Sequence, residues 1–262
     1  MSKFCSPGRF LPLPISLLFS ASLSGCGSGE IFSPASDSGE SIASHTPERV
    51  FRTEILGRQG ERLLATAECA PDSNGVFPEG SSVPDHGSRS IQVRNKNGKV
   101  ETLSVYFASG GGCIQRPLRD LWAASLNWRA MQWKGTGELS VHKIPPPNSG
   151  AMQSFRANYH TVQMGLISID WALDWTYYLN VGNFQDPENI IIHFIKSWGT
   201  SHISWWRGKV ELQQLTPQVT SFKLDAELSA TSRGESDVMA EVGEYYDKLK
   251  AAQPNWGALP TR

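Results

Sequence analysis

The chain has 262 residues, and its 24 Lys and Arg residues against 25 Asp and Glu residues give a formal net charge of −1. Because the charges balance, the chain has no basic field that would suggest a nucleic-acid partner. It also has no acidic tail that would suggest a cationic partner. Nine tryptophans all lie between Trp122 and Trp256. Because tryptophan buries a large area, this half of the chain is predicted to hold the core, a pocket or both.

Residues 1–25 have the layout of a secretory signal peptide. Lys3 and Arg9 precede an apolar stretch at residues 10–19, and small residues follow it. A positive end, an apolar centre and a small-residue cleavage point are the parts of an export signal. The apolar centre is too short to remain as a membrane-spanning helix. The mature chain is therefore expected to be exported.

Cys26 ends the run Leu-Ser-Gly-Cys at residues 23–26, directly behind the apolar centre. This run resembles the bacterial lipobox. The resemblance implies a bacterial lipoprotein in which Cys26 is lipidated, becomes the first mature residue and holds the chain to the cell envelope through acyl chains. Gly27 implies the outer membrane, facing the periplasm or the cell surface. The alternative is a cleaved secretory signal in which the cysteine occurs by chance.

Cys69 and Cys113 are the only thiols that remain once Cys5 leaves with the signal and Cys26 is lipidated. Exported proteins work in an oxidising compartment, so the two are predicted to form a disulfide. In the chain-entropy model, closing this loop contributes roughly 3 to 4 kcal/mol. The alternative is a pair of buried free thiols.

The remaining chain divides by composition. Residues 26–45 are rich in Ser and Gly and are predicted to form a flexible tether. Residues 46–99 form an N-terminal extension, which opens with a helix-start signal at residues 46–48, and residues 71–89 within it are predicted to be loop. Residues 100–252 hold the main domain, and residues 253–262 form a tail.

A hairpin is predicted over residues 90–107, because an Asn-Gly pair at residues 97–98 supplies the positive φ that a tight turn needs. The three glycines at residues 110–112 are expected to end its second strand. Pro117 then opens a helix with an apolar stripe. Further strands are expected at residues 138–144, 152–163, 167–179, 190–198, 203–212 and 219–230. A final helix, capped by Ser236, is expected over residues 236–251.

The strongest periodic pattern lies in residues 167–179. Every odd position is apolar, and most of the even positions are polar. Side chains alternate across a strand, so this pattern predicts a long strand with one apolar face. The apolar positions are Ile167, Ile169, Trp171, Leu173, Trp175, Tyr177 and Leu179.

The order of strand, helix, six strands and helix from residue 100 resembles the START-like, or SRPBCC, helix-grip superfamily. The likeness rests on residues 115–122 (QRPLRDLW), on 206–224 as the last two strands, and on 236–251 as the gripping helix. It implies an α+β fold in which a curved antiparallel sheet of about seven strands wraps on a long C-terminal helix. Residues 127–137 are short for the second helix of the family. A competing architecture is the half-barrel of periplasmic lipoprotein carriers.

No set of side chains predicts catalysis. Four histidines, His142, His160, His193 and His202, lie on or beside strands without metal-ligand spacing. Asp170 and Asp174 are four residues apart on one strand, roughly 13 Å, which is too far for two carboxylates to share a proton. The sequence predicts no catalytic residue, metal or cofactor, and enzyme status stays open.

The aromatic face of the sheet is the predicted ligand site. A tethered START-like domain with an apolar face implies a membrane-anchored lipoprotein that binds an apolar, lipid-like small molecule between the sheet and the C-terminal helix. The predicted ligand-binding residues are Trp122, Trp171, Trp175, Tyr177, Phe194 and Trp198. The alternative is a structural or assembly lipoprotein in which these rings form a filled core and the chain contacts envelope proteins.

Overall fold

The computed structural model describes residues 69–94, 98–163, 167–231 and 233–260. The predictions about the signal peptide, Cys26, the tether and the helix start at residues 46–48 lie outside these residues. None of the described helices is both long enough and apolar enough to cross a membrane.

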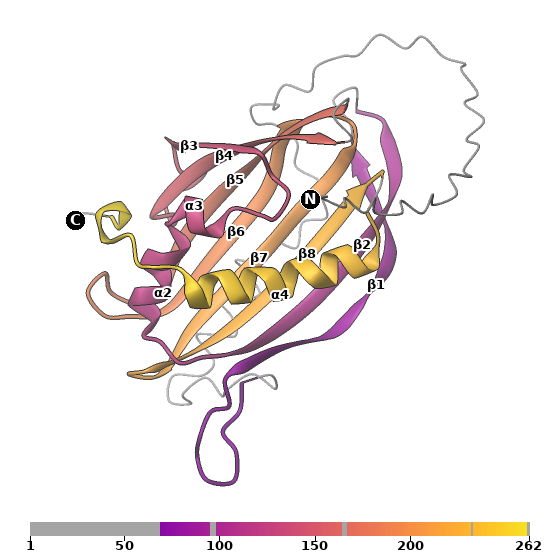
Figure 1. Ribbon diagram of the computed structural model, residues 1–262. Helices are drawn as coiled ribbons and strands as arrows, with labels where there is room; N and C mark the ends of the chain where they lie inside the picture. The colour runs from indigo at the N-terminus through magenta and orange to yellow at the C-terminus, as the bar shows by residue number, and fades with distance from the viewer. Residues whose placement is uncertain (1–68, 95–97, 164–166, 232, 261–262) are drawn as a thin grey trace, which may run out of the picture. The chain divides into compact units, whose positions relative to one another are not determined.

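One antiparallel sheet of eight strands forms the body of this region (Figure 1), with strand order β1-β2-β8-β7-β6-β5-β4-β3. The strands are β1 (Gly80–Arg94), β2 (Val100–Ile114), β3 (Glu138–Ile144), β4 (Gln153–Gln163), β5 (Ile167–Gly182), β6 (Pro187–Gly199), β7 (Ile203–Thr216) and β8 (Val219–Ala230). The curved antiparallel sheet that the START-like resemblance implied is confirmed.

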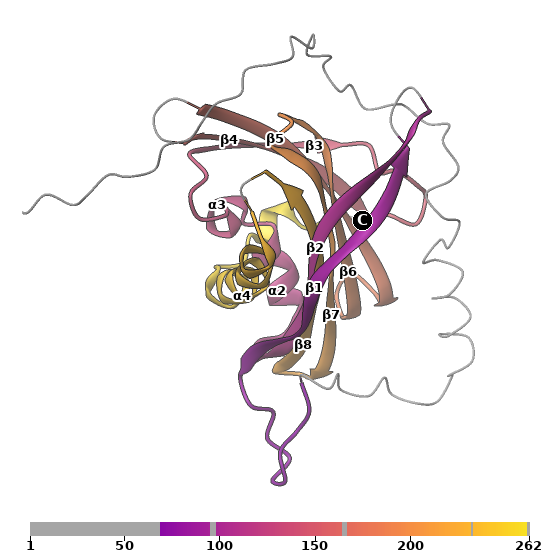
Figure 2. The same cartoon turned by 90° about the vertical axis from the view of Figure 1, so that its right-hand side faces the viewer.

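Three helices, α2 (Leu118–Ser125), α3 (Trp128–Met131) and α4 (Glu235–Ala251), lie on the concave face of the sheet (Figure 2). A short 3-10 turn follows at Trp256–Ala258. Helix α4 contacts β1, β2 and β8. The expected long helix is in fact short: its 17 residues rise about 25 Å, whereas the 16 residues of β5 reach about 50 Å.

The sheet has eight strands rather than about seven because β1 joins it, although only residues 90–94 of β1 were predicted to be strand, in the hairpin. Most of β1 falls within residues 71–89, which were predicted to be loop, and it pairs with β2 along most of its length. Its residues are mostly exposed, so its sequence lacks the apolar alternation that marks a half-buried strand. Strand β1 thereby joins part of the predicted N-terminal extension to the sheet.

The three glycines at residues 110–112 do not end β2, which continues to Ile114. A Cβ atom on Gly112 would overlap the carbonyl oxygen of Gly80 on β1, and one on Gly110 would lie 2.9 Å from Val242 on α4. Glycine is therefore needed here for the close approach of a neighbouring strand and of the helix.

Strand β5 follows the predicted alternation from Ile169 to Tyr177, with Trp171, Leu173, Trp175 and Tyr177 buried beneath the helices, whereas Ile167 at its start is exposed. Strand β6 follows the same alternation only in its first half. Between Lys196 and Trp198 the register with β5 shifts, so that Trp198 lies opposite Ala172 rather than opposite an inward residue. This bulge turns the Trp198 side chain to the outer face of the sheet. The prediction that Trp198 faces the helix is wrong.

Helix α4 begins one residue before its predicted cap. Gly234 occupies the capping position instead of Ser236, and its N–H donates to Asp237 Oδ2 at 2.7 Å. The predicted apolar stripe of α4 is confirmed, since Val238, Val242 and Leu249 are fully buried.

Cys69 and Cys113 form a disulfide, as the sequence predicts, with their Cα atoms 5.0 Å apart. Both are buried beside Val219. The bond fixes Cys69 to the end of β2.

Candidate ligand cavity

The centre of the concave face is filled with rings rather than hollow. Trp175 lies 4.7 Å from Phe194, 5.7 Å from Trp128 and 6.1 Å from Tyr245 between ring centroids. Tyr177 is fully buried, and its hydroxyl lies 3.4 Å from the Ser125 carbonyl oxygen. The predicted ligand residues Trp175, Tyr177 and Phe194 therefore pack the core beneath α4.

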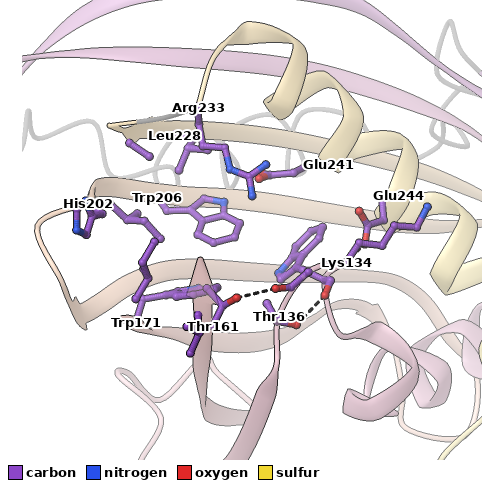
Figure 3. A pocket seen from close by; sticks show the side chains of 16 residues that line it. Lys134, Thr136, Thr161, Trp171, His202, Trp206, Leu228, Arg233, Glu241 and Glu244 are labelled. Atoms are coloured by element: carbon purple, nitrogen blue, oxygen red, sulfur yellow. Dashed lines mark hydrogen bonds between the residues drawn. The ribbon is translucent and has the colours of Figure 1, made fainter. Parts of the chain in front are cut away.

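A cavity of about 280 Å³ lies at one end of this core, where the N-terminal half of α4 covers the sheet (Figure 3). We call it the α4 cavity. Strands β4, β5, β7 and β8, the turn after α3 and helix α4 all contribute to it. Its inner wall includes Trp133, Ile169, Trp171, Trp206 and Leu228, with Glu241 on the helix side.

Three tryptophans form the aromatic wall of the α4 cavity. Trp206 lies 5.8 Å from Trp133 and 6.3 Å from Trp171 between ring centroids, and Tyr159 stacks on Trp171 at 5.3 Å. All four side chains are buried. Because each ring is held by its neighbours, the wall is preorganised and need not rearrange to meet an apolar molecule.

The same cavity gathers enclosed polar atoms that lack a protein partner. They are the indole nitrogens of Trp171 and Trp206 and Oε2 of Glu241, whereas the indole N–H of Trp133 interacts with the Tyr159 hydroxyl. Buried polar groups nearly always have a hydrogen-bond partner, so these three atoms leave hydrogen-bonding capacity at the cavity that a water molecule or a polar group of a ligand would satisfy.

Glu241 carries the main electrostatic feature of the cavity. Burial of its carboxyl raises its pKa to about 8, the charge of Arg233 opposes the rise, and the charges of Asp237 and Glu244 add to it. Arg233 is itself exposed and donates to Asp237 at 3.0 Å. The raised pKa favours the protonated carboxyl at neutral pH, and in that form Glu241 can both donate and accept a hydrogen bond.

Glu241 should make the stability of the protein fall as pH rises. Its ordinary pKa is 4.5, so between pH 4.5 and about 8 the folded chain holds a proton that the unfolded chain has lost. The free energy of unfolding therefore decreases with rising pH across this window. We expect Glu241→Gln to be more stable than wild type above pH 8, with the difference shrinking toward pH 4.5. Denaturant melts with the same pH profile for both proteins would contradict this.

A second cavity, of about 350 Å³, lies at the other end of the core beside α2 and the C-terminal turn. Trp122 lines it and stacks on Phe184 at 6.2 Å, while Arg119 lies over the Trp256 ring at 5.5 Å. Trp122 is thus separated from the α4 cavity and does not share a site with Trp171.

Both aspartates and His160 among the side chains weighed for chemistry have structural partners on the sheet. Asp174 accepts two hydrogen bonds from Arg156, at 2.6 and 2.7 Å, and His160 pairs with Asp170 at 2.7 Å. Within the described stretches, no group of three or more His, Cys, Asp or Glu residues could hold a metal ion.

Of the six predicted ligand residues, only Trp171 lines the α4 cavity. Sequence reasoning missed Trp133, Trp206 and Glu241, which also line it. A signal for Glu241 was present, since it lies three residues after Val238 and four before Tyr245 on the buried stripe of α4. An acid at such a position points toward the core and marks a polar group at the interface.

No protein-family model matches the chain, and no curated protein matches it. Among solved structures, the chain is similar to the human StarD13 lipid transfer and protein localization domain, with 8% identity and a TM-score of 0.41 over 80% of this chain and 100% of that one. It is also similar to a STAR-related lipid transfer protein fragment from Xanthomonas axonopodis, with 10% identity and a TM-score of 0.38 over 62% and 95% of the two chains. The Zhui aromatase/cyclase from a Streptomyces species gives 12% identity and a TM-score of 0.34 over 56% and 84%. At these values no ligand or activity transfers to this chain.

Proposed function

We propose that this domain binds an apolar, lipid-like small molecule in the α4 cavity, between the sheet and the C-terminal helix. The observation that carries the proposal is the partly open cavity walled by Trp133, Trp171 and Trp206, at one end of a core whose centre is filled. Ligand sites are usually concave and mostly apolar, with a few polar groups that fix orientation. At about 280 Å³ the cavity lies near the small end of such sites, so it suits a small ligand or one end of a longer one.

The test is titration with an environment-sensitive apolar dye. Ala230 lines the cavity at the end of β8, so Ala230→Phe should fill it and weaken dye binding at least tenfold. Its neighbour Ser229 lies on the opposite face of the same strand, and Ser229→Phe is the matched control that should leave binding unchanged. If the wild type binds no more dye than a control protein, the reading as an assembly lipoprotein with a filled core becomes the better one.

We further propose that Cys26 anchors the chain to the outer membrane by acylation. This rests on the lipobox-like residues 23–26 behind an apolar segment. Cys26→Ser should move the protein from the membrane fraction to the soluble fraction and abolish labelling by fatty acid, because each buried methylene contributes about 0.8 kcal/mol to membrane binding. A Cys26→Ser variant that still pellets with membranes and still incorporates fatty acid would contradict the anchor.

A further inference from the structure

The polar atoms of the α4 cavity restrict which ligand head groups fit it. An indole nitrogen only donates, so Trp171 and Trp206 together present two buried donors that have no acceptor in the described chain. Oε2 of Glu241 is buried as well and has no hydrogen-bond partner in the described chain. A matching head group must accept from an indole and also donate to this oxygen.

We propose that the α4 cavity recognises a neutral amphiphile by a hydroxyl group, whose oxygen accepts from the indole N–H groups and whose O–H donates to Glu241. This rests on the proposed function, since the apolar part of the same molecule occupies the aromatic wall. A free alcohol and the hydroxyl of a larger lipid share this chemistry.

Charged head groups fit the cavity less well. An ammonium group has donors only, so it would leave the indoles of Trp171 and Trp206 without an acceptor. A carboxylate would satisfy these indoles but has no proton to donate to Glu241 Oε2, and it would lie near Glu244. The cations that line the cavity, Lys134 and Arg233, are exposed, so water screens them, and Arg233 already pairs with Asp237.

The groups around Glu241 come from each element packed there. Asp237 and Glu244 lie on α4, Arg233 precedes it, Lys134 follows α3, and His202 precedes β7. Glu244 is occupied, because its carboxylate accepts from the Lys134 backbone N–H at 2.7 Å and pairs with Lys248 at 3.4 Å. In the protonated form that its raised pKa favours, Glu241 both accepts a hydrogen bond from the ligand hydroxyl and can donate one to it.

The volume limits the enclosed part of the ligand. At a share of about 30 Å³ for each water-sized group, 280 Å³ holds roughly nine non-hydrogen atoms. Six-carbon probes therefore fit within it whole.

The experiment compares 1-hexanol, hexane, hexanoate and hexylammonium as competitors of the apolar dye on the full-length chain at pH 7. We expect 1-hexanol to bind about tenfold more tightly than hexane and more tightly than either charged probe, which corresponds to about 1.4 kcal/mol. Equal affinity for 1-hexanol and hexane, or tighter binding of a charged probe, would overturn the inference and leave the proposed function standing. Failure of all four probes together with failure of the dye itself would contradict the proposed function instead.

Variants of Glu241 locate the effect. Glu241→Leu should remove the preference for 1-hexanol over hexane, whereas Glu241→Gln, whose amide still accepts and donates, should keep it within about threefold. Asp247→Leu changes an exposed acid on the same helix and should leave both affinities unchanged. If the Glu241→Leu variant still prefers 1-hexanol over hexane, the hydroxyl group does not hydrogen-bond to the Glu241 carboxyl.

Discussion

Leu173→Lys is expected to lower the free energy of unfolding by at least about 4 kcal/mol. Leu173 is fully buried on the inward face of β5, between Trp171 and Trp175. The substitution removes packed methyl groups and places an ammonium among apolar side chains, and each of these costs several kcal/mol. Denaturant melts followed by circular dichroism measure the loss, and the variant is expected to be largely unfolded at 37 °C.

The control for this substitution is Ile195→Lys on β6. Ile195 lies opposite Asp174, on the outer face of the sheet, and is 47% exposed. A lysine there keeps its charge in water, so we expect a loss below about 1 kcal/mol. Equal losses at Leu173 and Ile195 would mean that the two faces of the sheet are assigned incorrectly.

Trp175→Ala is the second substitution with a large expected effect, a loss of about 3 to 5 kcal/mol. The ring contacts Trp128, Phe194 and Tyr245 and joins β5, β6 and α4 into one core. Removing it leaves a cavity that the surrounding rings cannot close. Thermal unfolding should show a lowered Tm, while dye binding in the α4 cavity persists in the molecules that remain folded.

Trp198→Ala provides the matched comparison. The bulge places Trp198 on the outer face beside Ala172, where it is only half-buried. We expect a loss below about 1.5 kcal/mol and no effect on dye binding. If Trp198→Ala instead weakened dye binding as strongly as Ala230→Phe, the ligand would lie elsewhere than in the α4 cavity.

Regular alternation explains what could be predicted about the fold. The apolar face of β5 and the stripe of α4 follow from periods of two and of 3.6 residues, which depend only on local geometry. The β6 bulge depends on how two strands pair, which the alternation of residues alone does not reveal. Strand β1 is exposed along most of its length, so its sequence resembles loop although its backbone pairs with β2.

The candidate site was predicted less completely than the fold. The position of the tryptophans correctly predicted which half of the chain holds the core. Periodicity alone, however, does not distinguish a ring in a filled core from a ring beside a cavity. Trp175 and Trp171 share one face of β5, but α4 fills the space above the first and leaves space above the second. Trp133 comes from the turn after α3, which has no periodic pattern to reveal it.

The most direct test of the α4 cavity follows the indole N–H resonances of the protein labelled with ¹⁵N during titration with 1-hexanol and, separately, hexane. Each indole is assigned by a single Trp→Phe substitution. Ligand in the α4 cavity should shift the resonances of Trp133, Trp171 and Trp206, and leave those of Trp198 on the outer face and the half-exposed Trp256 in place. Binding in this cavity would be contradicted if saturating ligand shifted none of the resonances of Trp133, Trp171 and Trp206, or if it shifted those of Trp198 or Trp256 instead.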